Sequence, residues 1–170
     1  MHLSRDAFGA LFDGFHHAAF RLATRDTYGS VDAYQRFLAG EPKPPDHNAA
    51  WRTRVQRHTD AGRRIHRVHI LTRPLSPYLR FELDWGYRTN ATAGEEFSIL
   101  DTTDQPNPLQ HAPDFWLFDE STAVSMAYDT NGYFLAAQQE PDTHRWIHHR
   151  DTALAHATPF PTWWARHGTT

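Results

Sequence analysis

Cysteine is absent from this chain of 170 residues. Disulfide bonds, thiolate nucleophiles and zinc–thiolate sites are therefore excluded, and any catalysis has to use oxygen or nitrogen groups. Long apolar runs are also absent, since no stretch approaches the roughly 18 residues of a membrane-spanning helix. The first residues lack the basic head and apolar stretch of a secretory signal. We therefore expect a soluble, cytoplasmic protein without a membrane segment.

The motifs of several large enzyme classes are missing as well. The chain has no phosphate-binding glycine loop, no Gly-x-Ser-x-Gly elbow and no His-Glu-x-x-His pair, which argues against nucleotide, esterase and metalloprotease chemistry. Of its thirteen histidines, His144 and His148 have the spacing that places two imidazoles on one helical face. A metal needs further ligands, however, and no carboxylate recurs at matching spacing nearby. We expect no metal and no cofactor.

Charge is present but strongly segregated. Residues 52–73 contain seven arginines and one acid, Asp60, whereas residues 82–142 contain twelve acids and one base, Arg88. The formal net charge of -3 therefore conceals two segments of opposite sign. Either the basic segment binds an external anion, such as a nucleic-acid backbone or an acidic protein partner, or the two segments neutralise each other within one fold. The sequence leaves both interpretations open.

Length and composition favour a single domain over residues 1–170. A chain of this size, with 39% hydrophobic residues, buries roughly two thirds of its unfolded surface in one core. In the first part of the chain, hydrophobic periodicity and capping residues predict three helices, with a proline-rich connector at residues 41–45. Their expected bounds are Asp6 to His17 or slightly beyond, with Ala19 and Leu22 on the same face, then Ser30 to Gly40, and Asp46 to Gly62.

The rest of the chain favours short strands. β-Branched and aromatic runs predict strands at residues 64–71, 96–100, 114–119, 123–128 and 133–139. Ser76 before Pro77 predicts a helix that fades near residues 90–94, and further helices are expected over residues 141–157 and after Pro159. Asn131-Gly132 predicts a tight hairpin turn with positive φ at both residues. Because the later strands follow each other too closely for repeated parallel crossovers, we expect an α+β fold with a mainly antiparallel sheet of about five short strands, flanked by N-terminal and C-terminal helices.

The most unusual string in the chain is Asp114-Phe115-Trp116-Leu117-Phe118-Asp119. Its apolar residues alternate over both faces of a strand, which predicts a place at the centre of the sheet. The acids at its two ends are either turn residues or pocket carboxylates whose pKa is raised by aromatic surroundings. Arg80 and Glu82 stand two residues apart on the predicted helix and leave it on different sides.

Several strings together resemble an actinobacterial family of unassigned function: Phe20-Arg21-Leu22, residues 74–82, residues 114–119 and residues 128–135. The resemblance extends from about residue 7 to residue 168, and the tryptophan-containing hexapeptide is its most specific part. It implies a small single-domain protein encoded beside a WhiJ-type helix-turn-helix regulator, and no established reaction. Family members often have acids where this chain has Ala23 and Pro77, so a site built on those acids is altered here.

We therefore predict an accessory or regulatory protein that binds a transcription regulator or a small effector. Arg, Trp and Tyr dominate the energy of many interfaces, and this chain is rich in them. Arg63, Arg64 and Arg67 are the candidate contacts to a helix-turn-helix regulator protein. The candidate contacts to a small anionic ligand are Tyr78, Arg80 and Trp116.

The alternative is a cofactor-free enzyme that acts on a small anionic metabolite. In such an enzyme a carboxylate, Glu82, Asp114 or Asp119, would serve as acid or base, and an arginine would hold the anionic group. We do not expect nucleic acid as the partner, because the acidic second half would repel the backbone that the basic segment attracts.

Overall fold

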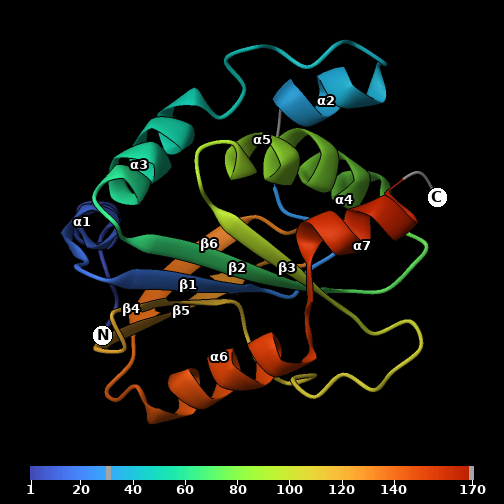
Figure 1. The fold of residues 1–170 in the computed structure, drawn as a ribbon. Coiled ribbons are helices and arrows are strands. Elements are labelled where there is room, and N and C mark those ends of the chain that lie inside the picture. The colour runs from blue at the N-terminus through green and yellow to red at the C-terminus, as the bar shows by residue number, and fades with distance from the viewer. Residues whose placement is uncertain (30–31, 169–170) are drawn as a thin grey trace.

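The computed structural model describes residues 1–29 and 32–168 and shows, within them, a seven-stranded sheet with helices on both faces (Figure 1). The strands lie in the order β6-β5-β4-β1-β2-β3-β7. Their bounds are β1 Ala18–Ala23, β2 Arg64–Leu71, β3 Glu96–Asp101, β4 Phe115–Phe118, β5 Thr122–Tyr128, β6 Phe134–Gln139 and β7 Thr158–Pro159. The helices are α1 Arg5–Gly14, α2 Asp32–Leu38, α3 Ala49–Asp60, α4 Pro77–Phe81, the π-helical η1 Glu82–Tyr87, α5 Arg88–Ala91, α6 His144–His156 and α7 Phe160–His167. None of the described helices is long and apolar enough to span a bilayer.

The sheet is mixed rather than mainly antiparallel. β1 pairs in parallel with β2, and β2 pairs in parallel with β3. The pairs β1–β4, β4–β5, β5–β6 and β3–β7 are antiparallel. The α+β class is therefore confirmed, but the expectation of a smaller and mainly antiparallel sheet is wrong.

The main error concerns β1, the central strand. The sequence prediction carried the first helix to His17 or slightly beyond, but α1 ends at Gly14 and residues 18–23 form a strand. Every residue of β1 after Ala18 is buried, because the strand is covered on both faces, and such strands show no alternation of apolar and polar residues. The spacing of Ala19 and Leu22 matched a helical face by coincidence.

Two helical crossovers build the parallel half of the sheet. α2 and α3 connect β1 to β2, and the continuous segment α4–η1–α5 connects β2 to β3. Both crossovers lie on the face of the sheet opposite α6 (Figure 1). Ser76 begins the second crossover as predicted, since its Oγ accepts a hydrogen bond from the Leu79 N–H at 3.1 Å. Asn48, rather than Asp46, precedes α3, whereas Gly62 follows that helix at φ +79° as expected. The expected cap of the preceding helix, Ser30, lies outside the described residues.

The β5–β6 hairpin forms as predicted, but its turn differs in detail. The Gly132 N–H donates to the Asp129 carbonyl at 3.0 Å, so Thr130 and Asn131 occupy the centre of the turn. In this loop only Gly132, at φ +87°, has positive φ. A Cβ at this position would lie 2.5 Å from the Thr27 carbonyl oxygen, so glycine is required both for its conformation and for its close approach to the loop after β1.

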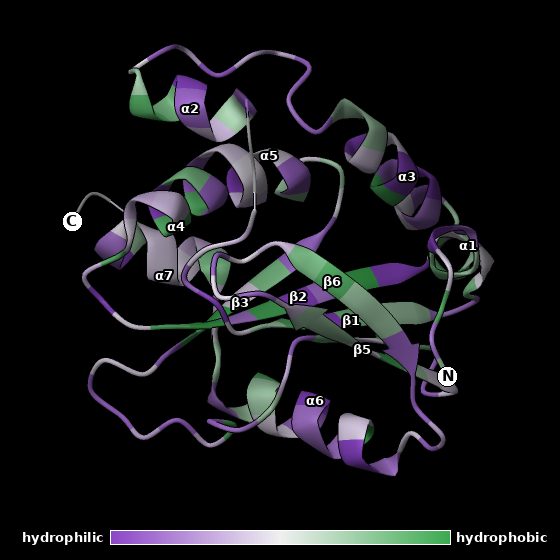
Figure 2. Ribbon diagram, turned by 180° about the vertical axis from the view of Figure 1, so that it is seen from behind, coloured by the Kyte–Doolittle hydropathy of each residue, from purple (hydrophilic) through white to green (hydrophobic). Residues whose placement is uncertain are grey.

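The two faces of the sheet are packed differently. On the α6 face the core is continuous, and it includes Phe20, Leu22, Phe115, Leu117, Trp146 and Ala153. On the opposite face the apolar side chains form separate clusters. One cluster lies under α1 and α3 and contains Ile65 and Trp116, and another lies under α4, η1 and α7 and contains Leu79 and Phe97. Figure 2 shows hydrophobic residues in the strands and many hydrophilic residues along α6 and α3.

The basic and acidic segments neutralise each other where β2 and β3 lie side by side. Three ion pairs connect these strands and the residues next to them: Arg64–Glu96, Arg67–Glu95 and Arg73–Asp101. Arg54 and Arg57 pair instead with Asp13 in α1. Neutralisation of one segment by the other, one of the two interpretations left open by the sequence, therefore accounts for Arg64, Arg67 and Arg73, whereas Arg54 and Arg57 are neutralised by an acid outside the acidic segment.

Candidate functional site

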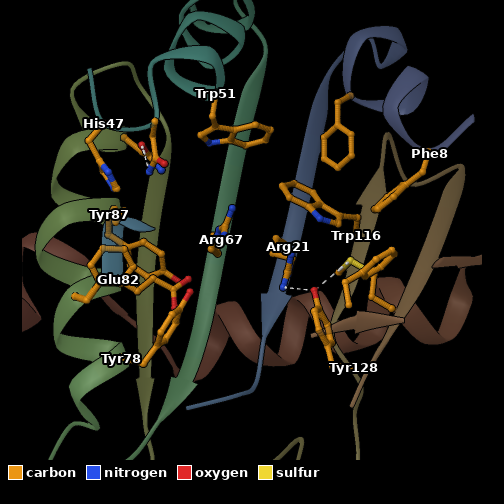
Figure 3. Close-up of a pocket in the computed structure, with 18 residues that line it drawn as sticks. Phe8, Arg21, His47, Trp51, Arg67, Tyr78, Glu82, Tyr87, Trp116 and Tyr128 are labelled. Carbon is orange, nitrogen blue, oxygen red and sulfur yellow. Dashed lines mark hydrogen bonds between the residues drawn. The ribbon is translucent and has the colours of Figure 1, made fainter. Parts of the chain in front are cut away.

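A cavity of about 510 Å³ lies on the sheet face that carries the crossovers, between α1 and α3 on one side and α4–η1–α5 on the other (Figure 3). We call it the arginine cavity, because Arg21 and Arg67 lie in its floor. Its walls are mostly aromatic and are formed by Phe8, Phe12, Trp51, Tyr78, Phe81, Tyr87, Trp116, Tyr128 and Phe134.

Strand register sets the floor of the arginine cavity. Arg21 on β1 is the direct partner of Arg67 on β2, and directly paired residues point to the same face of a sheet. On β4 the partner of Arg21 is Trp116, and on β3 the partner of Arg67 is Phe97. Two guanidinium groups therefore project from neighbouring central strands (Figure 3). Register places Trp116 beside the first and Phe97 beside the second.

The first guanidinium, that of Arg21, is bound firmly to the protein. Its Nη2 lies 2.9 Å from Asp114 Oδ2 and also donates to the Tyr128 hydroxyl at 3.2 Å, while its Nε donates to the Leu22 carbonyl. Asp114 accepts further hydrogen bonds from the Thr24 N–H, the Thr24 hydroxyl and the Tyr28 hydroxyl. Burial raises the pKa of Asp114, but the charge of Arg21 and these hydrogen bonds outweigh burial and lower it on balance.

The second guanidinium, that of Arg67, is held without hydrogen bonds. Its Nε lies 3.3 Å from Glu95 Oε2, but neither atom forms a hydrogen bond with any described residue. The other carboxylate oxygen of Glu95 accepts from Trp51 Nε1 at 2.7 Å. The rings of Tyr87 and Trp116 both have centroids 5.7 Å from Arg67 Cζ, so cation–π attraction and the nearby charge fix its position.

Burial dominates the titration of the Glu95 carboxyl. Its side chain is fully enclosed, and burial raises its pKa although the charge of Arg67 acts in the opposite direction. The contrast with Asp114 is chemical. Asp114 accepts hydrogen bonds from several donors that favour its anion, whereas for Glu95 the Trp51 donor and the nearby Arg67 do not outweigh burial.

A π-helical segment forms one wall of the arginine cavity. η1 interrupts the helix between α4 and α5 and places Glu82, Gly86 and Tyr87 on the cavity side; such interruptions occur frequently at functional sites. The Oε2 atom of Glu82 is buried and has no hydrogen-bond partner among the described residues. A Cβ placed on Gly86 would meet no heavy atom closer than Glu82 Cγ at 3.8 Å, so this stretch of wall has free space in front of it.

Tyr87 is fixed by a buried histidine. The Tyr87 hydroxyl lies 2.7 Å from His69 Nδ1, and His69 Nε2 lies 2.8 Å from the Arg25 carbonyl. Because a carbonyl only accepts, His69 donates through Nε2, and its Nδ1 accepts from the Tyr87 hydroxyl. The wall of the cavity is therefore rigidly tied to the loop that follows β1.

A family model described as Domain of unknown function (DUF6879) matches residues 6–165. The chain belongs to the DUF6879 family. Every residue that lines the arginine cavity, from Phe8 to Phe134, falls inside the matched segment. The cavity thus lies within the DUF6879 domain, and the family assignment agrees with the resemblance to a family of unassigned function. No curated protein matches the chain.

In this DUF6879 domain, three residues that the sequence nominated as ligand-binding or catalytic line the cavity. Tyr78 and Trp116, predicted ligand contacts, face each other across it together with Glu82 (Figure 3). Asp114 lies behind Arg21 and is occupied by the hydrogen bonds described above. Its lowered pKa is opposite in direction to the raised pKa considered for a pocket carboxylate. Arg80 is exposed and does not line the cavity.

The remaining candidate acid, Asp119, lies at the other end of β4, outside the arginine cavity. Its carboxylate accepts from the backbone N–H groups of His16, His17 and Ala18 at 2.6, 2.7 and 3.0 Å. Burial raises its pKa, but these three donors lower it on balance. Asp119 thus fastens the connection between α1 and β1.

The predicted partner contacts of the DUF6879 domain are distributed over different environments. Arg64 is exposed and binds Glu96 through two hydrogen bonds of 2.8 Å. The half-buried Arg63 donates to His58 Nδ1. Arg67 lies in the arginine cavity rather than on the outer surface, because alternation along β2 turns Ile65, Arg67 and His69 toward the crossover helices.

Sequence reasoning missed Arg21, Glu95 and Trp51 as site residues. Arg21 was hidden by the helical interpretation of residues 18–22. The available signal was a lone arginine between the apolar residues Phe20 and Leu22, since a charge inside a buried strand needs a partner.

Proposed function

We propose that this protein binds a small molecule with an anionic group and a flat aromatic body in the arginine cavity, and that the molecule acts as an effector. One observation carries the proposal: Arg67 has a largely buried guanidinium that donates no hydrogen bond to any described residue, in a cavity it shares with Arg21. A guanidinium is a planar fork of donors that matches carboxylates and phosphates.

The surroundings of Arg67 support this proposal. Its side chain is only 14% exposed, and an ionic hydrogen bond is stronger in such surroundings than in water. The Arg21 guanidinium next to it is fixed by Asp114 and Tyr128. An anionic group that enters the cavity therefore meets one rigid cation and one cation with unused donors.

The aromatic walls define the remainder of the ligand. Trp51 and Trp116 contact each other edge to face with ring centroids 6.1 Å apart, and Phe12 packs against both. Pockets for small molecules are mostly apolar with a few oriented polar groups, and the volume of about 510 Å³ falls in their usual range of roughly 300–1,000 Å³. A planar ring system is the body that such walls accommodate best.

NMR titration with matched aromatic acids tests the proposal. The panel consists of 3-phenylpropionate, 3-(4-hydroxyphenyl)propionate and indole-3-propionate, together with their α-amino analogues phenylalanine, tyrosine and tryptophan. We expect at least one of these compounds to shift the backbone amide resonances of Gly86 and Tyr87. The Arg67→Gln substitution should weaken that binding at least about tenfold, as expected for loss of hydrogen bonds from a charged group.

Arg64→Gln is the matched control, because Arg64 lies on the same strand but is exposed and paired with Glu96. It should leave the affinity unchanged. The proposal is rejected if no compound of the panel shifts these resonances, or if Arg67→Gln binds as tightly as the unmodified protein.

A glycine substitution offers a second test that leaves all charges in place. Gly86→Ala should keep the fold, because its nearest neighbour is at contact distance and alanine favours helix by about 0.5–1 kcal/mol. The added methyl group narrows the cavity, so binding of the panel compound should weaken. Gly9→Ala is the control, since Gly9 lies in α1 with open space around it.

We also propose that a helix-turn-helix regulator detects the bound state, in line with the regulatory role expected from the sequence. Phe134 supports a link between cavity and surface: it lines the cavity, stacks on Phe8 and is 51% exposed. Its neighbour Leu135 is 62% exposed on the edge strand β6. Co-purification with a neighbouring regulator should be reduced by Leu135→Ser if this edge is the contact, and by replacement of Arg63 and Arg64 together if the basic strand is.

An enzyme without a cofactor is a second candidate, supported by the buried and unpartnered Oε2 of Glu82 in the same cavity as Arg67. In such an enzyme Glu82 would act as the acid or base and Arg67 would hold the anionic group. Asp114 suits this role less well, because its oxygens are occupied. Recovery of a bound compound chemically unchanged after prolonged incubation with the protein would count against this candidate.

A further inference from the structure

Given the proposed function, we infer that the ligand is a zwitterion: its anionic group binds at Arg67, and a protonated nitrogen binds at Glu82. The inference rests on the proposed function and narrows it. It selects molecules of the aromatic amino acid type over simple aromatic acids, and it makes Glu82 the residue that determines this selectivity.

The balance of charge around the arginine cavity supports the inference. Arg21 is paired with Asp114, and Arg67 is paired with Glu95. Glu82 is a third carboxyl group of this region and forms no ion pair with any described residue. An aromatic acid would add another carboxylate to this cavity and would leave Glu82 without a cationic partner. A zwitterion adds no net charge and gives Glu82 a cationic partner.

The hydrogen-bonding state of the cavity leads to the same conclusion. Glu82 Oε2 is a buried acceptor without a donor. The Arg67 guanidinium donates no hydrogen bond to any described residue, although its Nε lies 3.3 Å from the equally unpartnered Glu95 Oε2. A buried polar group without a partner is unfavourable, and a ligand group that pairs with it gains this energy on binding. One ligand that carries both an acceptor and a cationic donor satisfies both side chains.

The two groups are positioned so that one small molecule can reach both. Arg67 projects from the floor, whereas Glu82 projects from the η1 wall beside Tyr78 and Tyr87 (Figure 3). The charge of Glu82 also contributes to the raised pKa of Arg67, which places the two side chains within mutual electrostatic influence. Trp116 and Phe8 line the other side of the cavity, where they offer aromatic surfaces to a ring (Figure 3).

The experiment compares the acids of the panel with their α-amino analogues, pair by pair, in the unmodified protein and in Glu82→Gln. Each pair differs only in one ammonium group, so the difference in affinity isolates the interaction with Glu82. In the unmodified protein the best-bound amino acid should bind at least about tenfold more tightly than its matched acid, as expected for a hydrogen bond between charged groups. In Glu82→Gln this preference should disappear.

Asp84→Asn provides the matched control on the same segment. Asp84 lies on η1 but pairs with Arg88 at the surface, so its neutralisation changes the net charge of the protein equally without touching the cavity. It should leave the preference for the amino acid intact. A similar reduction in Asp84→Asn would show that the effect is one of overall charge, and it would overturn the assignment to Glu82.

The remaining outcomes separate the two proposals. If the acids bind as tightly as their amino analogues, or more tightly, the zwitterion inference is wrong while the proposed function stands. If no member of either series binds, both are rejected. A preference for the amino acid that survives in Glu82→Gln likewise rejects the role given to Glu82.

Discussion

The two arginine–carboxylate pairs beneath the cavity are close in space but differ in how they are built. In the Arg21–Asp114 pair, Arg21 donates a hydrogen bond to the Asp114 carboxylate and another to the Tyr128 hydroxyl. Arg67–Glu95 has an N–O separation of 3.3 Å and no hydrogen bond between its members. The carboxyl pKa is lowered in the first pair and raised in the second.

Under the proposed function, this difference assigns Arg21–Asp114 to the support of the fold and Arg67–Glu95 to ligand recognition. The Asp114 carboxylate accepts hydrogen bonds from Thr24 and Tyr28 in the loop that follows β1. The Arg21–Asp114 pair therefore stabilises the fold. Arg67–Glu95 places a buried carboxyl group beside the guanidinium without forming a hydrogen bond to it, so the donors of Arg67 are left unused. Predictions that separate the two pairs therefore test whether the fold and the ligand site are carried by different residues.

The largest effect is expected from Asp114→Asn. The substitution leaves the buried Arg21 without a counter-charge and weakens the hydrogen bonds to Thr24 and Tyr28, so the free energy of unfolding should fall by about 3–5 kcal/mol. Urea denaturation measures this change. Asp104→Asn is the control, because Asp104 is 88% exposed, and it should change stability by less than about 0.5 kcal/mol. A loss below about 1 kcal/mol for Asp114→Asn would show that the pair is not structural.

The two carboxyl groups should respond to pH in opposite directions. The pKa of Asp114 is lowered by folding, so its stabilising contribution is present above the unfolded value of about 3.9 and is lost as the pH falls below it. The pKa of Glu95 is raised, so its contribution is fully present below about pH 4.3 and is lost as the pH rises through the folded pKa.

Unfolding free energies from about pH 3 to pH 7 measure this opposition. The stability difference between the unmodified protein and Asp114→Asn should grow with rising pH. The corresponding difference for Glu95→Gln should shrink or change sign. If the stability differences of the two variants changed with pH in the same direction, the proposed opposition between Asp114 and Glu95 would be wrong.

Glu95→Gln should have a small effect at neutral pH. Glutamine resembles the protonated acid that burial favours and keeps the acceptor for Trp51 Nε1, so stability should fall by less than about 1 kcal/mol or should rise. Thermal unfolding near pH 7 measures it. A loss as large as that of Asp114→Asn would show that Arg67 depends on Glu95 as strongly as Arg21 depends on Asp114.

The smallest effect is expected from Arg64→Ala. Arg64 and Glu96 form a third pair on the same two strands, but their side chains are 66% and 43% exposed, and water screens such a pair. Stability should fall by less than about 1 kcal/mol, and added salt should reduce the difference further. Chemical denaturation measures this change. A larger loss of unfolding free energy that does not depend on salt would mean that the stabilising effect of the three pairs does not depend on their burial.

Much of the local structure could be predicted from the sequence. The strand at residues 64–71 and the cap at Ser76 were predicted correctly. The strand preference of β-branched residues and the capping of a helix by a serine before proline are local effects that depend on nearby atoms. The pairing of the hairpin strands was also correct. Its turn was placed differently because Asp129 accepts from the N–H groups of Asn131 and Tyr133, and this arrangement shifts the centre of the turn.

The topology and half of the candidate site could not be predicted in this way. A strand covered on both faces shows no periodicity, so β1 and its Arg21 were concealed within an apparent helix. The pairing of Arg67 with Glu95 depends on a parallel alignment created by a crossover of more than twenty residues. Tyr78, Glu82 and Trp116 were nominated because aromatic and acidic residues close together in sequence indicate their chemistry locally, and all three line the arginine cavity.

The arginine cavity spans the junction between two differently connected halves of the sheet. Arg67, Glu82 and Tyr87 come from the segment with helical crossovers, whereas Trp116, Tyr128 and Phe134 come from the antiparallel meander. These segments are separate in the chain and meet along the β1–β4 pairing. Trp116 and Tyr128 also contact the guanidinium groups of Arg67 and Arg21, whereas Phe134 stacks on Phe8. The meander therefore contributes both to the aromatic wall and to the placement of the charged groups, and position 134 is where the wall can change with least effect on the arginines.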